Sequence, residues 1–244
     1  MRIILMSDLH MSHNGKPIWD TDVKEHLNFC VEKIKQIPDV DVIIIAGDLS
    51  NDGSLSSYQM VDNAFDKINI PIYCCAGNHD NILNLQNTLK QIKYIKHTQV
   101  NDWHLVFLNT IVPDELDPST NKARGYLSEI DLYNLEDLLS HNFSNTIIVM
   151  HHPAIEPDGW LNRRLLENRE QFIQMISKYS HVKMVLMGHS HEYYIRDIED
   201  IKYIISPSIG YAFSAALPKF HIDKGKESFL VIDTKTKEIQ KIQL

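Results

Sequence analysis

Six short runs of apolar and β-branched residues, separated by segments with helical periodicity, constrain the fold of this chain more than any other feature. Within each run the apolar residues are continuous and do not alternate with polar ones, which is typical of strands buried on both faces. The runs are RIILM (2–6), DVIIIA (41–46), IYCCA (72–76), HLVFL (104–108), TIIVM (146–150) and VKMVLM (182–187).

The segments between most of these runs carry apolar residues at the spacing of one helix face. Alternating strands and helices predict an α/β layered fold. A further helix is expected to start at Ser128, where Asp131 completes an approximate capping box. The other predicted helices cover 21–37, 57–68, 81–93 and 165–179, and two more strands are expected at 202–208 and 229–234.

With 244 residues, the chain is long enough to bury a sizeable core. It contains no internal repeat and no linker-like stretch, so we expect a single domain over residues 1–244. Within it, the stretch of about 195–225 is a candidate for a small cap or for the contact of a homodimer, because SIGYAFSAAL (208–217) is apolar. The same stretch would serve equally as core.

Charge and composition exclude several classes of protein. The formal net charge of −8 argues against a general nucleic-acid binder, which normally presents a basic surface. Small anionic substrates remain compatible, because a bound metal reverses the local field. The apolar runs are far shorter than the roughly 18 residues of a membrane span, and the three cysteines lack zinc-ribbon spacing. We therefore expect a soluble, cytoplasmic protein with neither a membrane nor a long nucleic acid as partner.

Polar side chains that bind metals follow five of the six apolar runs directly. Carboxyl ends of parallel strands meet at one edge of a sheet, where open α/β sheets bind ligands. Each short motif alone is more often a turn or a helix cap, but five of them on one edge indicate a common site. The motifs are DLH (8–10), GD (47–48), GNHD (77–80), HHP (151–153) and GHSH (188–191).

The side chains expected to converge suit two divalent ions rather than one. They are Asp8, His10, Asp48, Asn78, His151, His189 and His191. A single catalytic ion keeps a position open for water or substrate and would not use them all, whereas two ions that share a carboxylate would. Carboxylate, amide and imidazole ligands without thiolate favour Mn or Fe, with Zn as an alternative. Two such ions stabilise the attacking and leaving oxygens of phosphoryl transfer.

Taken together and in order, these five motifs resemble those of the calcineurin-like metallophosphoesterases. The resemblance implies a four-layer αββα sandwich of two mixed sheets flanked by helices. It also implies two ligand sets that share Asp48 as the bridging residue. One ion would be held by Asp8, His10, Asp48 and His191, and the other by Asp48, Asn78, His151 and His189.

The resemblance also implies a catalytic role for His79, which is not among those ligands. His79 would bind the phosphate or protonate the leaving oxygen, and Asp80 would hold its imidazole and favour the charged form. From the residues alone, the alternative is that His79 is a loop histidine at the start of a helix. His152 would orient the loop that carries His151.

Within the family, the likeness is greatest to bacterial cyclic-nucleotide phosphodiesterases of the Icc/CpdA type. It implies hydrolysis of a phosphodiester by a metal-bound hydroxide, with 3′,5′-cyclic AMP as the leading small-molecule substrate. The candidate substrate-binding residues are Asn78, His79 and two aromatic residues, Trp160 and Phe213, although both aromatics would serve equally as packing residues. The likeness is carried by GDLSNDGSLSSY (47–58), HHPAIEPDGWLNRRLLENREQF (151–172), HVKMVLMGHSHEYY (181–194) and SPSIGYAF (206–213).

Two other functions stay open. One is a different esterase on the same site, such as a phosphomonoesterase, a nucleotide pyrophosphatase or a nuclease. The other is a scaffold that uses the fold without catalysis, and such a protein would be expected to have lost metal ligands. Because every ligand is present, we expect an enzyme, a metal-dependent phosphoric ester hydrolase.

Overall fold

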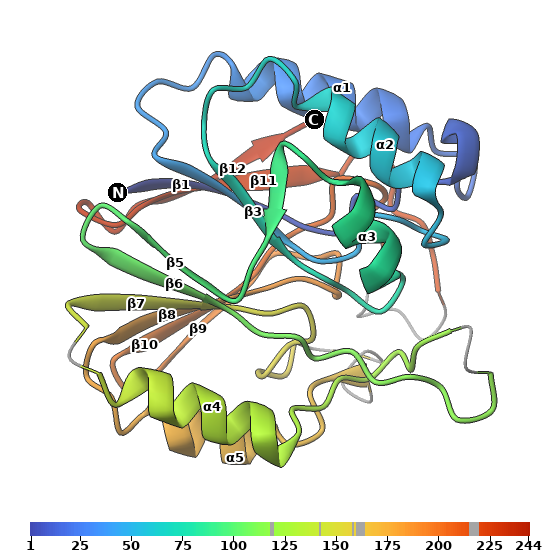
Figure 1. The fold of residues 1–244 in the computed structure, drawn as a ribbon. Coiled ribbons are helices and arrows are strands. Elements are labelled where there is room, and N and C mark those ends of the chain that lie inside the picture. The colour runs from blue at the N-terminus through green and yellow to red at the C-terminus, as the bar shows by residue number, and fades with distance from the viewer. Residues whose placement is uncertain (118–119, 142, 158, 160–163, 215–219) are drawn as a thin grey trace.

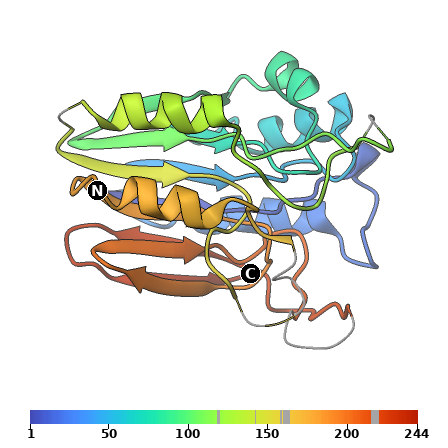
Figure 2. The same ribbon diagram turned by 90° about the horizontal axis from the view of Figure 1, so that it is seen from below.

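The computed structural model shows four layers, in which two mixed sheets pack face to face and helices cover both outer faces (Figure 1). It describes residues 1–117, 120–141, 143–157, 159, 164–214 and 220–244. Helices α1, α2 and α3 lie over the first sheet, and α4 and α5 lie side by side over the second (Figure 2). This arrangement confirms the predicted αββα sandwich.

The helices are short and amphipathic, in keeping with one face on a sheet and one in solvent. Within the described residues, none of them combines the length and the apolar character that crossing a membrane requires. Their bounds are α1 (Val23–Ile34), α2 (Leu55–Ala64), α3 (Ile82–Thr88), α4 (Glu129–Leu139) and α5 (Arg169–Ile176), with a 3-10 turn, η1, at His13–Gly15.

The first sheet has the strand order β12-β11-β1-β2-β3-β4. The four strands β1 to β4 run parallel, and β11 pairs antiparallel with both β1 and β12. The strands are β1 (Arg2–Met6), β2 (Val42–Ala46), β3 (Ile72–Cys75), β4 (Ile92–Tyr94), β11 (Ser228–Asp233) and β12 (Ile239–Gln243).

The second sheet has the order β5-β6-β7-β8-β10-β9. Its four central strands run parallel, and the two edge strands, β5 and β9, pair antiparallel with their neighbours. The strands are β5 (His97–Val100), β6 (Trp103–Phe107), β7 (Asn145–Val149), β8 (Val182–Met187), β9 (Tyr194–Ile198) and β10 (Ile201–Ile205).

The central strands are mostly apolar because each contributes to two cores. In β1, Ile3 and Leu5 belong to the core between the two sheets, whereas Ile4 and Met6 pack beneath the helices of the first outer layer. The second sheet divides its residues in the same way between the inner core and the layer of α4 and α5. Burial on both faces therefore produces the continuous apolar runs of the sequence.

The edges of the sheets differ from the prediction. The strands β4, β5, β9 and β12 were not expected, since edge strands such as β5 and β9 are largely exposed and polar. Residues 89–93 are not helical, because α3 ends at Thr88 and β4 begins at Ile92. The capping box of Ser128 and Asp131 is confirmed at the start of α4.

The stretch of about 195–225 contributes both to the second sheet and to the site at its edge. It supplies most of β9 and all of β10, up to Ile205. Beyond β10 the chain returns to the loop after β1, where Ile209 and Gly210 donate backbone hydrogen bonds to the carbonyls of Ser7 and Asp8. This return brings residues 206–214 beside the strand ends that carry the predicted metal ligands.

Candidate metal centre

The seven predicted metal ligands lie together at the carboxyl ends of five strands. Six of them are buried and Asn78 is half-buried. Both sheets contribute, because β1, β2 and β3 belong to the first sheet and β7 and β8 to the second. In chain order, Asp8 and His10 follow β1, Asp48 follows β2, Asn78 follows β3, His151 follows β7, and His189 and His191 follow β8.

The backbone at these strand ends is strained. A non-glycine residue in the left-handed region costs about 1–3 kcal/mol, and such strain persists where the surrounding structure imposes it, often at functional sites. Five of the seven residues have φ angles there, namely Asp8 (53°), His10 (47°), Asp48 (52°), His189 (72°) and His191 (56°). These unfavourable backbone conformations therefore bring the metal-binding side chains together.

One glycine is needed for a different reason, the close approach of two strand ends. A Cβ atom on Gly77 would lie 2.2 Å from Oδ1 of Asp48 and 2.4 Å from its backbone nitrogen. No side chain fits at that distance, so the loop after β3 approaches Asp48 only because residue 77 is glycine.

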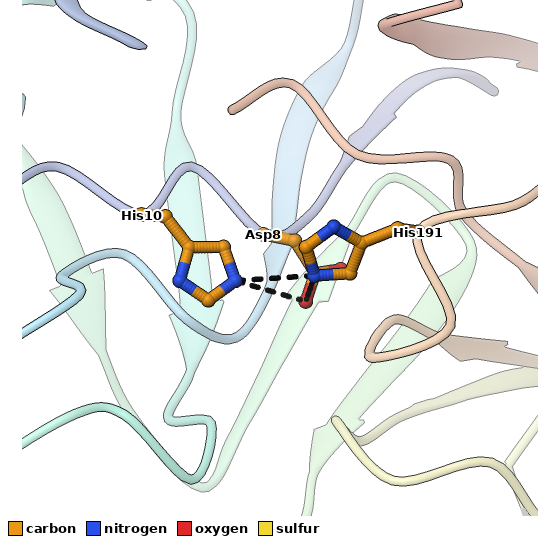
Figure 3. Close-up of side chains that lie close together, drawn as sticks. All are labelled: Asp8, His10 and His191. Atoms are coloured by element: carbon orange, nitrogen blue, oxygen red, sulfur yellow. Dashed lines mark hydrogen bonds and ion pairs between the residues drawn. The ribbon is translucent and has the colours of Figure 1, made fainter. Parts of the chain in front are cut away.

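The first cluster consists of Asp8, His10 and His191 (Figure 3). Nε2 of His10 lies 3.1 Å from Nε2 of His191, and Oδ1 of Asp8 lies 3.3 Å from Nε2 of His191 and 3.9 Å from Nε2 of His10. All three side chains are buried, so one carboxylate oxygen and two ring nitrogens face each other away from water.

The second cluster consists of Asp48, His151 and His189, with Asn78 beside it. Nε2 of His151 lies 3.3 Å from Oδ2 of Asp48, 3.2 Å from Oδ1 of Asn78 and 3.2 Å from Nδ1 of His189. Oδ2 of Asp48 also lies 3.6 Å from Nε2 of His10 in the first cluster. Asp48 is thus the carboxylate that the two clusters share.

Three of the histidines are oriented by acceptors behind their rings. An oxygen that accepts from Nδ1–H fixes the tautomer and leaves the lone pair of Nε2 for a metal. The three contacts are His10 Nδ1 to Asn51 Oδ1 at 3.2 Å, His151 Nδ1 to the Ala46 carbonyl at 2.8 Å, and His191 Nδ1 to the Tyr211 carbonyl at 2.6 Å.

Burial and charge set the protonation of the clusters. Burial lowers the pKa of His10 and of His189 to about 3, so both rings are neutral, the form that binds metal. Burial also disfavours the charged form of His151, but the carboxylates of Asp48 and Asp8 outweigh it and raise its pKa to about 9. The carboxylates thus attract a positive charge to this position.

The donor atoms fit metal ions. In the described part of the chain, Oδ1 of Asp8, which faces Nε2 of His191, is buried without a hydrogen-bond partner. The lone pairs of His10 and His191 face each other at 3.1 Å, an arrangement that a cation between them would stabilise. Buried acceptors that converge without donors are expected where metals bind, since unpaired buried charges are otherwise costly.

The structure corrects the expected contact between Asp80 and the imidazole of His79. The ring of His79 is exposed, and its Nδ1 lies 3.0 Å from the backbone carbonyl of Asn51. The buried carboxylate of Asp80 instead accepts four hydrogen bonds, from the backbone nitrogens of Leu49, Ser50 and Gly77 and from the Tyr58 hydroxyl. Asp80 therefore joins the loops after β2 and β3, because it faces their backbone donors rather than the neighbouring ring.

We expect Asp80→Ala to lower the free energy of unfolding by about 3 kcal/mol or more, because it leaves several buried donors without an acceptor. Denaturant unfolding of the metal-free protein measures this effect. Asp52→Ala, which removes a more exposed carboxylate of the same loop region, should change stability far less. A stable Asp80→Ala protein would show that its carboxylate does not hold the loops together.

The other predicted residues lie in different surroundings. Trp160 lies outside the described residues. Phe213 is only 6% exposed, and its ring packs 4.4 Å from that of His191, so it borders the metal cluster from within the protein. His152 is buried against His151 and His189, and its Nδ1 lies 2.7 Å from Oγ1 of Thr110. This position suits the expected orienting role of His152.

Several groups that orient the histidines of the site were not predicted from the sequence. The side chain of Asn51 and the carbonyls of Ala46 and Tyr211 orient the histidines. A backbone carbonyl leaves no mark in a sequence, because every residue has one. Asn51 lies three residues after Asp48, and only this proximity could have suggested its contact with His10.

Comparison with known proteins supports the same class of site. Residues 1–193 match the family model of the calcineurin-like phosphoesterases. The chain therefore belongs to the calcineurin-like phosphoesterase family, and its buried His/Asp clusters are those of a metallophosphoesterase.

Two curated relatives align over most of the chain. A protein of Nostoc sp., named a 3′,5′-cyclic-nucleotide phosphodiesterase, is 27% identical and covers 94% of this chain and 86% of its own length. A protein of Pseudomonas aeruginosa, named a 3′,5′-cyclic adenosine monophosphate phosphodiesterase, is 25% identical over 91% of this chain and 81% of its own. Among solved structures, a dimetal phosphatase from Danio rerio shares the fold, with a TM-score of 0.68, 13% identity and coverage of 99% and 98%.

Proposed function

We propose that this chain is a dinuclear-metal phosphodiesterase that hydrolyses a 3′,5′-cyclic nucleotide, with cyclic AMP as the leading substrate. The observation that carries the proposal is the pair of buried His/Asp clusters that share Asp48. The names of the relatives from Nostoc sp. and Pseudomonas aeruginosa, which align over at least 91% of the chain, support the choice of substrate.

The proposed ligands divide between two ions that share Asp48. Carboxylate, amide and imidazole donors without thiolate favour Mn or Fe and admit Zn. When bound, the ions supply Lewis-acid polarisation of the phosphoryl oxygens and lower the pKa of the attacking water. The two sets are Asp8, His10, Asp48 and His191 for one ion and Asp48, Asn78, His151 and His189 for the other.

His79 is the group that we propose for proton transfer. Because Nδ1–H donates to the carbonyl of Asn51, Nε2 is the ring atom left for the substrate. In the charged form, Nε2 gives its proton to the ester oxygen as the P–O bond breaks, and this lowers the barrier for departure of the alkoxide. His79 lines a cavity of about 560 Å³, which is in the size range of small-molecule sites.

The backbone of His79 has a second function, independent of its ring. Its N–H donates to Oδ1 of Asp48 at 2.8 Å, which leaves Oδ2 directed at the histidines of both clusters. The same residue therefore orients the shared carboxylate and presents an imidazole to the substrate. This division predicts that removing the ring leaves the metal ligands in place.

Turnover of three substrates by Mn²⁺-loaded protein tests the proposal. We expect hydrolysis of cyclic AMP to AMP at an efficiency comparable to that of bis(p-nitrophenyl) phosphate, and little cleavage of the monoester p-nitrophenyl phosphate. An Asp48→Ala preparation excludes a contaminating enzyme. Cleavage of the artificial diester alone would refute the cyclic-nucleotide substrate, and preference for the monoester would refute a phosphodiesterase.

A further inference from the structure

An aromatic surface leads from the candidate metal centre towards solvent. The ring of Phe213 packs against His191, and Phe220 continues outward with its centroid 5.4 Å from that of Phe213. Trp19 follows, with its centroid 5.3 Å from that of Phe220. Phe213 is buried, but Trp19 is 60% exposed and Phe220 is 43% exposed. The outer two rings are therefore accessible from solvent, and Phe213 connects them to His191.

A second path connects Trp19 to the same cluster. The ring of Tyr211 packs 4.9 Å from that of His10 and 4.7 Å from that of His191. The side chain of Trp19 lies close enough to that of Tyr211 to interact with it, which places Trp19 beside a residue that packs against two of the proposed metal ligands.

The backbone at Trp19 indicates that its side chain is required there. Ile18 and Thr21 exchange backbone hydrogen bonds of 3.0 and 2.8 Å, so Trp19 and Asp20 form the two-residue turn of a tight hairpin. Both have positive φ angles, 49° and 58°, as in a type I′ turn, which favours asparagine and glycine. A bulky aromatic residue in this conformation is an outlier, and its exposed ring does not offset the strain by burial.

We propose that Trp19 and Phe220 form a stacking surface for the base of the nucleotide substrate; this inference rests on the proposed function. The metal centre would bind the anionic phosphate, so the base is the part of the substrate that still needs a binding site on the protein. A purine or pyrimidine has two flat apolar faces, which aromatic side chains bind without regard to base identity. The two exposed rings, which connect to His191 through the ring of Phe213, match that requirement.

Steady-state kinetics with paired substrates tests the stacking surface. In Trp19→Ala and Phe220→Ala we expect KM for cyclic AMP to rise by about 5- to 100-fold with kcat little changed. The base-free analogue, 1-O-methyl ribose 3′,5′-cyclic phosphate, should be turned over with the wild-type KM. Trp19→Phe should restore most of the affinity, and Tyr133→Ala, which removes an exposed aromatic ring from α4, should leave KM unchanged.

A binding measurement separates this inference from the proposed function. AMP should quench the tryptophan fluorescence of the wild-type protein and not that of Trp19→Phe. If the wild type does not hydrolyse cyclic AMP but this difference is seen, the proposed function fails and the stacking surface stands. If cyclic AMP is hydrolysed and both alanine variants keep the wild-type KM, the stacking surface is refuted alone.

A further variant controls for the possibility that the alanine substitutions damage the fold. Trp19→Asn removes the ring and places a residue that type I′ turns favour, so it should fold at least as well as the wild type while losing affinity for cyclic AMP. Variants that lose turnover of the base-free analogue to the same extent would overturn the inference, because the rings would then support the metal centre rather than the base.

Discussion

Replacing Asp48 by alanine is expected to abolish turnover and to prevent the protein from holding two metal ions at once. Oδ2 of Asp48 lies 3.3 Å from Nε2 of His151 and 3.6 Å from Nε2 of His10, so the carboxylate serves both clusters. Its loss removes the negative charge that offsets the two cations. Metal content by plasma mass spectrometry, together with turnover of bis(p-nitrophenyl) phosphate, measures the effect.

Two further variants make the Asp48 test specific. Asp48→Asn retains an oxygen that can accept the hydrogen bond from the backbone of His79 but lacks the charge, so it should also lose activity while folding normally. Asp197→Ala removes an exposed carboxylate of β9 that pairs with Lys202, and it should behave as the wild type does. Two bound ions and normal turnover in Asp48→Ala would refute the bridging role.

Replacing His79 by alanine is expected to lower kcat by about 10²–10⁴-fold while both metal ions stay bound. The imidazole is exposed, packs edge-on against the ring of His10 and, among the described residues, hydrogen-bonds the carbonyl of Asn51. The hydrogen bond to Asp48 comes from the backbone and survives the substitution. The loss should be greatest for substrates with a poorly stabilised leaving alkoxide, such as cyclic AMP. It should be smaller for bis(p-nitrophenyl) phosphate, whose phenolate leaves without a proton.

The leaving-group comparison distinguishes proton transfer from a structural role. His141→Ala serves as the control, because His141 is an exposed histidine after the end of α4, where Nδ1 contacts the carbonyl of Asp137. Equal losses on both substrates in His79→Ala would indicate that the ring binds phosphate rather than donating a proton. Unchanged turnover would remove any catalytic role for His79.

The fold and the site differ in how far they could be predicted from the sequence. The central strands were predicted because burial on both faces leaves a continuous apolar run, as in β2, where all residues from Val42 to Ala46 are buried. The edge strands were missed because a strand that pairs on one side only and is exposed to solvent does not need a continuous apolar sequence. In β9, from Tyr194 to Ile198, the middle three residues are exposed.

The site was predicted as a set of residues but not as a geometry. Glycine followed by a metal-binding side chain identifies strand ends such as Gly47-Asp48, yet it gives no sign that Asp48 itself turns into the left-handed region. The hydrogen bonds of Asp80 could not be predicted either. Its position next to His79 suggested a contact with that imidazole, but the carboxylate instead accepts from backbone N–H groups of the loops after β2 and β3. Trp19 was missed because its turn lies outside the strand-end motifs.

The division of the proposed ligands between the two sheets has a mechanical consequence. The first sheet supplies Asp8, His10, Asp48 and Asn78, and the second supplies His151, His189 and His191, so each ion would bind residues of both sheets. A pair of ions would then cross-link the two sheets at one end of their interface, the rest of which is held by the inner core. A shift of one sheet along the other by a single residue would separate the ligands of both ions. Metal occupancy would therefore depend on how the two sheets are aligned with each other.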